Sequence, residues 1–157
     1  MILKLLHPGA SPKGPLQEAA ETYRKRIRMC RTEEVYLKAE KILEKTAGAQ
    51  QGALKREGER ILQAVGSRDR LIVLDPSGRE HTSPELAKRM QSWMSGGSRA
   101  ICFALGSPWG LDESLKGQAH ESWSLGRLTL PHDLARVIVW EQLYRAETIL
   151  RGEPYHK

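Results

Sequence analysis

The sequence predicts an α/β fold in which a mostly parallel sheet is flanked by helices, as one domain over residues 1–157. Strand-like segments alternate with helix-like segments along the chain, which is the order that parallel sheets require. Two continuous apolar runs, from Arg70 to Asp75 and from Ala100 to Leu105, have the length and composition of strands buried on both faces. A chain of 157 residues can bury such a core without disulfide or metal support.

The first third of the chain predicts a strand, a helix and a second strand. Met1 to Leu6 is apolar and ends at the turn residues His7-Pro8-Gly9. Leu16 to Met29 has helical spacing, and Glu34 to Lys38 reads as the next strand. Five cations between Arg24 and Arg31 crowd the end of this helix, where they form either an RNA-binding surface beside Tyr23 or a solvated face favoured by the helix dipole.

The middle of the chain predicts a helix and then the first buried strand. A polar stretch from Lys45 to Gln51 leads into a helical stripe from Ala53 to Val65. The strand from Arg70 to Asp75 follows, and Pro76-Ser77-Gly78 is expected to form the turn behind it.

The second buried strand lies between two loops of different kinds. Ser83 is the expected N-cap of a helix that runs to about Met94, and Gly96-Gly97 end it. The strand from Ala100 to Leu105 leads into Gly106-Ser107-Pro108-Trp109-Gly110. This loop is either a tight turn that needs glycine or a place where backbone approaches a ligand.

The last third predicts the longest helix. Trp123 to Leu130 is a short segment of mixed character, and Pro131 opens a helical stripe that ends before Gly152. Within it, Glu141 and Arg145 have the spacing of a supporting ion pair. Trp140 and Tyr144 give the helix more apolar surface than one core helix needs, which predicts a homodimer with this helix at its interface.

Composition limits the function classes. The net charge of +6 favours a polyanionic partner, although many basic proteins bind no nucleic acid. Cys30 and Cys102 lie outside any metal or disulfide spacing and are expected to be buried free thiols. The 5 histidines are scattered, so neither a metal site nor a hydrolase triad is predicted. No apolar segment is long enough for a membrane span and the start lacks signal-peptide features, so we expect a cytoplasmic protein.

A set of segments in the C-terminal half resembles the RlmH (YbeA-like) family of the SPOUT superfamily. No one segment is specific, but their combination and order are. The matching segments are Leu71–Asp75, Gly106–Leu111, Ser122–Leu125, Leu128–His132, Arg136-Val137, Glu141–Ala146 and Pro154–Lys157.

The resemblance implies an enzyme that uses S-adenosyl-L-methionine to methylate N3 of a pseudouridine in large-subunit (23S) ribosomal RNA. It also implies a deep C-terminal trefoil knot, a homodimer with the site at the subunit interface, and ribosomal RNA or the ribosome as partner. Backbone groups of three loops would hold the cofactor. By position in the family, the cofactor-binding residues would be Leu74, Gly106, Leu125, Gly126, Arg127, Leu128, Thr129 and Leu130.

The resemblance also directs attention to the last helix and the chain end. Arg145 and His156 are the catalytic candidates, because a cation would favour the N3 anion and an imidazole could accept its proton near neutral pH. Tyr155 would stack on the target base. The expected substrate-binding residues are His132, Arg136, Tyr144 and Tyr155.

Two readings compete with this one. A SPOUT enzyme that acts on transfer RNA would share the fold. A non-catalytic ribosome-binding or assembly factor would keep the fold and lose the cofactor. Ser107 and Trp109 make the second reading possible. The family usually has glycine at the position of Ser107 and a small or polar residue at the position of Trp109. Ser107 adds a Cβ at a crowded turn.

Overall fold

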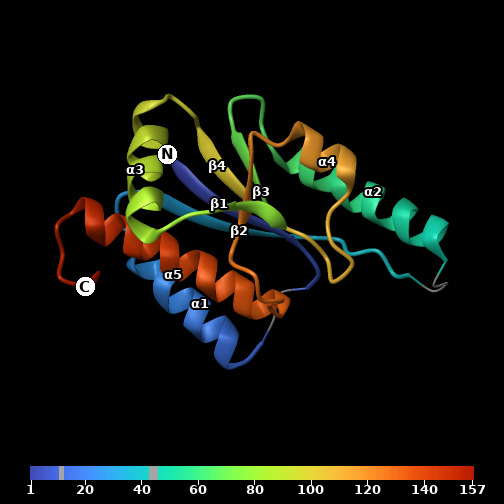
Figure 1. The fold of residues 1–157 in the computed structure, drawn as a ribbon, viewed down its shortest axis with the longest axis horizontal. Coiled ribbons are helices and arrows are strands. Elements are labelled where there is room, and N and C mark those ends of the chain that lie inside the picture. Colours follow the sequence, from blue (N-terminus) through green and yellow to red (C-terminus); the bar gives the residue numbers. More distant parts are fainter. Residues whose placement is uncertain (11–12, 43–45) are drawn as a thin grey trace.

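The computed structural model describes residues 1–10, 13–42 and 46–157, and its centre is a five-stranded sheet (Figure 1). The strands lie in the order β2-β1-β4-β3-β5, and every neighbouring pair is parallel. This architecture confirms the predicted fold class. The knot concerns the path of the chain rather than strand order, and it stays a prediction. The strands are β1 (Ile2–Pro8), β2 (Arg31–Leu37), β3 (Arg70–Glu80), β4 (Ala100–Leu105) and β5 (Glu121–Ser124).

Helices cover both faces of the sheet. Helices α1, α3 and α5 pack together on one face and bury the larger apolar cluster, whereas α2 and α4 lie on the other (Figure 1). Because β4 lies between the two clusters, all of its residues are buried. The helices are α1 (Pro15–Arg26), α2 (Ala47–Ala64), α3 (Ser83–Ser95), α4 (Glu113–Gln118) and α5 (His132–Leu150).

One predicted turn is wrong. Pro76-Ser77-Gly78 does not turn back; β3 continues to Glu80, with a shift in its register against β5 between Leu74 and Arg79. Gly78 permits this path, because a Cβ there would lie 2.6 Å from the backbone N and C atoms of Trp123. The residues have turn chemistry, but close contact with β5 keeps them extended.

Two helix starts also differ from expectation. Helix α2 begins at Ala47, because the Thr46 side chain accepts a hydrogen bond from the Ala49 N–H and caps it. The predicted polar loop is therefore helical from Ala47 on, and Lys45 lies outside the described residues. Helix α3 is capped by Thr82 rather than Ser83, in a capping box with Glu85.

The last elements position the loops of interest. Helix α4 was not predicted, because its single turn and a half buries only Leu115 and leaves no periodic pattern. Strand β5 ends at Ser124, so the chain from residue 125 to Pro131 is a loop that leads into α5. Gly152, with φ 65°, follows the end of α5 as predicted.

Candidate active site

A cavity of about 580 Å³ lies where the chain leaves β4 and β5 and where β3 shifts register. The loops that follow these strands form its walls, as expected for ligand sites in parallel sheets. Among the predicted cofactor-binding residues only Arg127 does not line it. The lining residues from that set are Leu74, Gly106, Leu125, Gly126, Leu128, Thr129 and Leu130.

The Gly106 turn is packed too tightly for a side chain. A Cβ on Gly106 would lie 2.5 Å from the carbonyl oxygen of Gly110 and 3.0 Å from Cγ of Leu111. Gly110 closes the turn by donating its N–H to the Ser107 carbonyl at 2.9 Å, with φ 100°. The packing of the turn itself therefore requires glycine here, and Gly106, which has only backbone atoms, is part of the cavity wall.

The two departures from the family pattern fit this turn. Ser107 has no positive φ, so its Cβ adds no backbone strain. Trp109 is absent from the cavity lining, and 48% of its surface is exposed. Ser107 is therefore an unstrained part of the cavity wall, and Trp109 lies outside it.

His132 connects the start of α5 to the Gly106 turn. Its Nδ1 lies 3.0 Å from the Gly106 carbonyl oxygen, and because a carbonyl only accepts, Nδ1 carries the proton and donates. Burial is the main reason that the pKa of His132 is lowered. The His7 ring lies 5.1 Å from the His132 ring, and burial followed by the nearby His132 lowers the pKa of His7 to about 4. His7 played no part in the sequence-based site, since no motif marks it.

Asp75 brings a carboxylate to the cavity wall. It accepts hydrogen bonds from the Ser77 N–H at 2.8 Å and from the Lys116 ammonium at 2.6 Å. Burial alone would raise the pKa of Asp75, but the bonds from Lys116 and Ser77 outweigh burial and lower it. Asp75 therefore stays ionised, and its place at the end of a buried strand was the sequence signal for it.

The chain end folds back onto α5 and α1 in an aromatic and arginine cluster. Tyr155 packs edge-on against Tyr144 with ring centroids 4.9 Å apart, and Arg145 lies 4.6 Å from the Tyr155 ring. Arg26 covers the Tyr144 ring at 4.3 Å. Arg145 also donates to Glu141 through Nε at 2.9 Å, so the predicted ion pair is present. We call Arg26, Glu141, Tyr144, Arg145 and Tyr155 the tail cluster.

The tail cluster fixes the protonation of its phenol. Burial, together with hydrogen bonding to Tyr23 and Glu141, raises the pKa of Tyr155 to about 12. Its Oη donates to Glu141 at 3.1 Å. Tyr155 is therefore neutral near pH 7 and offers a ring face rather than a base.

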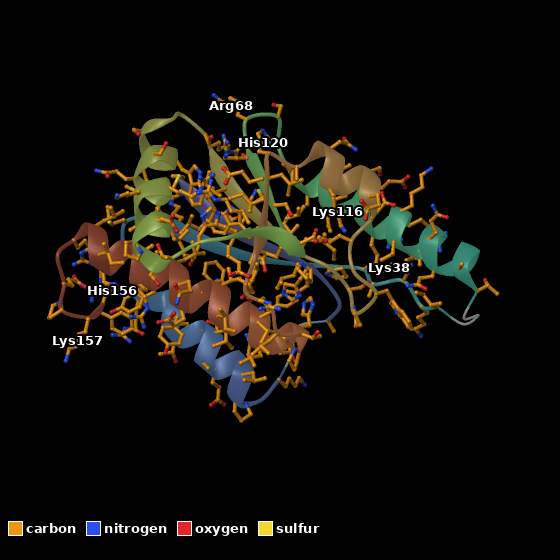
Figure 2. The ribbon with its side chains drawn as sticks, in the orientation of Figure 1. Lys38, Arg68, Lys116, His120, His156 and Lys157 are labelled. Carbon is orange, nitrogen blue, oxygen red and sulfur yellow. The ribbon has the colours of Figure 1, made fainter. Side chains whose placement is uncertain are left out.

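His156 and Lys157 extend beyond the tail cluster. Both side chains are exposed, and Figure 2 shows them at the end of the molecule opposite to Lys38 and Lys116. His156 is thus accessible to a large substrate. For the expected role as a base, the acceptor nitrogen of the substrate must come within hydrogen-bond distance of the His156 ring.

Arg136 is buried and does not face a substrate in this chain. Its guanidinium pairs with Glu34 at 2.9 Å from Nε, contacts Gln17, and has no exposed side-chain surface. Glu34 also accepts from Tyr36 and Trp140. This geometry corrects the expected substrate contact: Arg136 fastens α5 to β2, and we no longer include it among the substrate residues.

The two groups of site residues lie at opposite ends of α5. His132 starts the helix beside the cavity, and Arg145 lies 13 residues later, or about 20 Å along a helix. Within one chain the tail cluster therefore cannot act at the cavity. Trp140 and Tyr144 also leave no spare apolar surface for the predicted dimer interface, because they are 0% and 7% exposed within the single chain.

Three features of residues 1–10, 13–42 and 46–157 concern metal ligands, membrane spans and thiols. There, no group of three or more His, Cys, Asp or Glu side chains could hold a metal. No helix among those residues has the length and apolar character to cross a membrane. Cys30 and Cys102 are free and buried, as predicted.

Comparison with known proteins gives concordant matches. A family model described as "Predicted SPOUT methyltransferase" matches residues 1–156. A protein of Hahella chejuensis named ribosomal RNA large subunit methyltransferase H is 37% identical over 158 residues, covering 100% of this chain and 99% of that protein. A protein of the same name from Leuconostoc mesenteroides is 39% identical over 159 residues and covers 100% of both chains. The solved structure of a probable methylase family protein from Haemophilus influenzae shares the fold, with a TM-score of 0.58 at 13% identity over 99% of this chain and 70% of that one.

Proposed function

The chain belongs to the SPOUT methyltransferase family, and we propose that it transfers a methyl group from S-adenosyl-L-methionine to N3 of a pseudouridine in 23S ribosomal RNA. The observation that carries this proposal is the cavity of about 580 Å³, where the middle of β3 and the loops after β4 and β5 gather nearly all the expected cofactor residues. Full-length relatives named as large-subunit rRNA methyltransferases support the substrate class.

The cavity has the chemistry that this cofactor needs. Its volume lies in the range of small-ligand sites. The Gly106 turn contributes backbone atoms to the wall, Leu125 and Leu130 supply apolar surface, and Asp75, which is paired with Lys116, adds carboxylate oxygens. Held in this cavity, S-adenosyl-L-methionine would supply an electrophilic methyl group.

The protein's own contribution at the cavity is orientation. Methyl transfer is an in-line displacement, so its rate depends on holding the two reacting atoms in line at about 3–3.5 Å. His132 fixes the Gly106 carbonyl through its Nδ1–H, and α5 fixes His132. A packed helix thus holds the turn in place.

The acceptor side requires a second subunit. N3 of pseudouridine must lose its proton before it can attack, and cations stabilise the resulting anion. Arg145, Tyr155 and His156 suit these tasks, but within one chain they lie about 20 Å from the cavity. We propose a homodimer in which the tail of one subunit reaches the cavity of the other. There, Tyr155 would stack on the base, Arg145 would stabilise charge and His156 would accept the proton.

A methyl-transfer assay that offers ribosomes and transfer RNA as alternative acceptors tests this function. Purified protein with radiolabelled S-adenosyl-L-methionine should label the large-subunit RNA of ribosomes that lack the modification, and mass spectrometry should place the methyl on a pseudouridine. Preferential labelling of transfer RNA would favour the other SPOUT reading. Absence of cofactor binding by calorimetry would favour the assembly factor. Because ribosomes are cytoplasmic, we expect the enzyme to act there.

A further inference from the structure

A second cavity, of about 350 Å³, lies between the first turn of α3 and the middle of α5. Leu74, Trp123 and Leu125 line both this cavity and the cofactor cavity, so the two share a wall. We call the second one the α3–α5 cavity. Its other lining residues include His81, Thr82, Ser83, Ile138, Gln142 and Leu143.

One side of the α3–α5 cavity is aromatic. The rings of His81 and Trp123 lie 4.8 Å apart at 57°. The indole N–H of Trp123 donates to Glu121 at 3.0 Å, and Trp93 stacks on its ring at 5.5 Å, so Trp123 is held firmly. Rings of this kind can replace the stacking that a nucleobase loses when it leaves an RNA stack.

The polar groups of the cavity favour a neutral ligand with hydrogen-bonding edges. Nε2 of His81 is buried and has no hydrogen-bond partner among the described residues. Across the cavity, the Ser83 hydroxyl donates to the Gln142 side-chain oxygen at 2.7 Å. Glu80 is the charged residue in the lining, which contains no lysine or arginine. Arg89 lies near His81 and Trp123 but is paired with Glu121, so the lining itself offers a phosphate a carboxylate and no cation, whereas an uncharged heterocycle needs none.

We propose that the α3–α5 cavity receives the acceptor base, a uracil-type ring turned out of the RNA. The inference rests on the proposed function, because it is the wall shared with the cofactor cavity that brings an occupant close to the transferable methyl group. The His81 ring and the remaining exposed part of Trp123 contact the base on the side away from the other subunit's Tyr155, and His81 Nε2 supplies a hydrogen bond to the edge of the base. His81 then recognises the substrate, a role that no motif indicated.

The sharpest test fills the cavity and compares two identical substitutions on one helix. Ser83→Trp places a large ring in the α3–α5 cavity, whereas Ser92→Trp places the same ring on the exposed side of α3. We expect Ser83→Trp to lower kcat/KM on ribosomes at least about 100-fold with cofactor affinity unchanged by calorimetry, and Ser92→Trp to change neither. Full activity in Ser83→Trp would overturn the proposal. Loss of its cofactor binding would also do so, because the cavity would then belong to the cofactor site.

A milder pair keeps the test decisive if Ser83→Trp fails to fold. His81→Ala removes both the ring and the nitrogen, and His81→Phe removes only the nitrogen. We expect KM for ribosomes to rise about tenfold in His81→Ala and less in His81→Phe, because stacking contributes most of the contact. Equal and unchanged KM values in both variants would contradict a base in this cavity.

Direct binding separates this inference from the proposed function. Pseudouridine nucleoside, titrated into the wild-type protein with S-adenosylhomocysteine present, should shift the NMR signals of the His81 ring and the Trp123 indole. Shifts confined to other residues, or no saturable shift, would overturn the inference even if ribosomes are methylated. Shifts at these two residues would support it even if ribosomes prove to be the wrong acceptor.

Discussion

The cofactor cavity and the tail cluster lie at the two ends of α5 and present different kinds of atoms to a ligand. The cavity presents backbone and aliphatic side chains, and a Cβ on Gly106 would lie 2.5 Å from the Gly110 oxygen. The tail cluster consists of side chains, with two tyrosines and two arginines in ring contact. Shape governs the first region and residue identity governs the second. The regions should therefore fail differently: backbone changes should affect cofactor binding, and tail changes should affect turnover.

The largest expected effect comes from deleting residues 155–157. Methyl transfer to ribosomes should fall by about 10³-fold, because the stacking ring and the proton acceptor are both lost. Cofactor affinity should stay within about twofold of wild type, since the tail cluster lies about 20 Å from the cavity of its own chain, and the tail of the other subunit is proposed to contact the base rather than the cofactor. Turnover and calorimetry on the same sample measure both quantities.

A conservative variant sharpens this result. Tyr155→Phe keeps the ring contacts with Tyr144 and Arg145 and removes only the hydrogen bonding of the hydroxyl to Glu141 and Tyr23. It should keep most of the turnover. Wild-type turnover in the deletion variant would refute the tail's role, and a parallel loss of cofactor binding would move the tail to the cofactor side.

Next in size is the effect of Arg136→Met on stability. Arg136 joins α5, the helix that connects the two regions, to β2 through Glu34. Removing one partner of a buried pair leaves the other charge uncompensated, and the free energy of unfolding should fall by about 3–5 kcal/mol. Urea denaturation measures this loss. The double variant Arg136→Met with Glu34→Gln should recover part of it, and a single variant as stable as wild type would contradict the structural role.

Gly106→Ala tests the cavity end. The added Cβ must displace the Gly110 backbone, so the dissociation constant for S-adenosyl-L-methionine should rise about 100-fold. Some loss of stability is expected as well, because the clash exists without ligand. Gly117→Ala is the matched control, since a Cβ there meets nothing within 4 Å. Equal affinities in the two variants would remove the Gly106 turn from the cofactor site.

The same difference explains what the sequence could predict. Continuous apolar runs identify buried strands by composition, so β3 and β4 and the loop behind β4 were found, and most expected cofactor residues line one cavity. Arg136 looked like a substrate residue because a sequence shows charge but not burial. Its partner Glu34 is 102 residues away, a distance over which no periodic pattern operates.

Other features depended on tertiary contacts. His81 and His7 had no motif, and their significance comes from cavities and neighbouring rings that exist only in the fold. The extension of β3 through Gly78 likewise depends on β5 lying against its backbone. Local turn chemistry predicted the opposite, because it cannot sense a strand that lies some forty residues later.

The smallest predicted effect distinguishes the two ends by pH. His7 is 1% exposed beside the cofactor end, and burial, then His132 and Arg136, lower its pKa to about 4, against the opposing influence of Glu34 and Asp133. In the unfolded chain its pKa is about 6.5, so between these values the unfolded state binds more protons than the folded state. The stability that neutral His7 permits is therefore complete above about pH 6.5 and is lost as the pH falls toward 4.

From pH 7 to pH 5 the free energy of unfolding should fall by about 2 kcal/mol, with a further contribution from His132, whose pKa is also lowered. Urea denaturation of His7→Gln should show a correspondingly weaker dependence of the unfolding free energy on pH than the wild-type protein. The Tyr155 phenol of the tail cluster should not titrate in this range, because its pKa is raised to about 12. A His7→Gln protein with the full wild-type acid sensitivity would show that the cofactor end is not where acid acts.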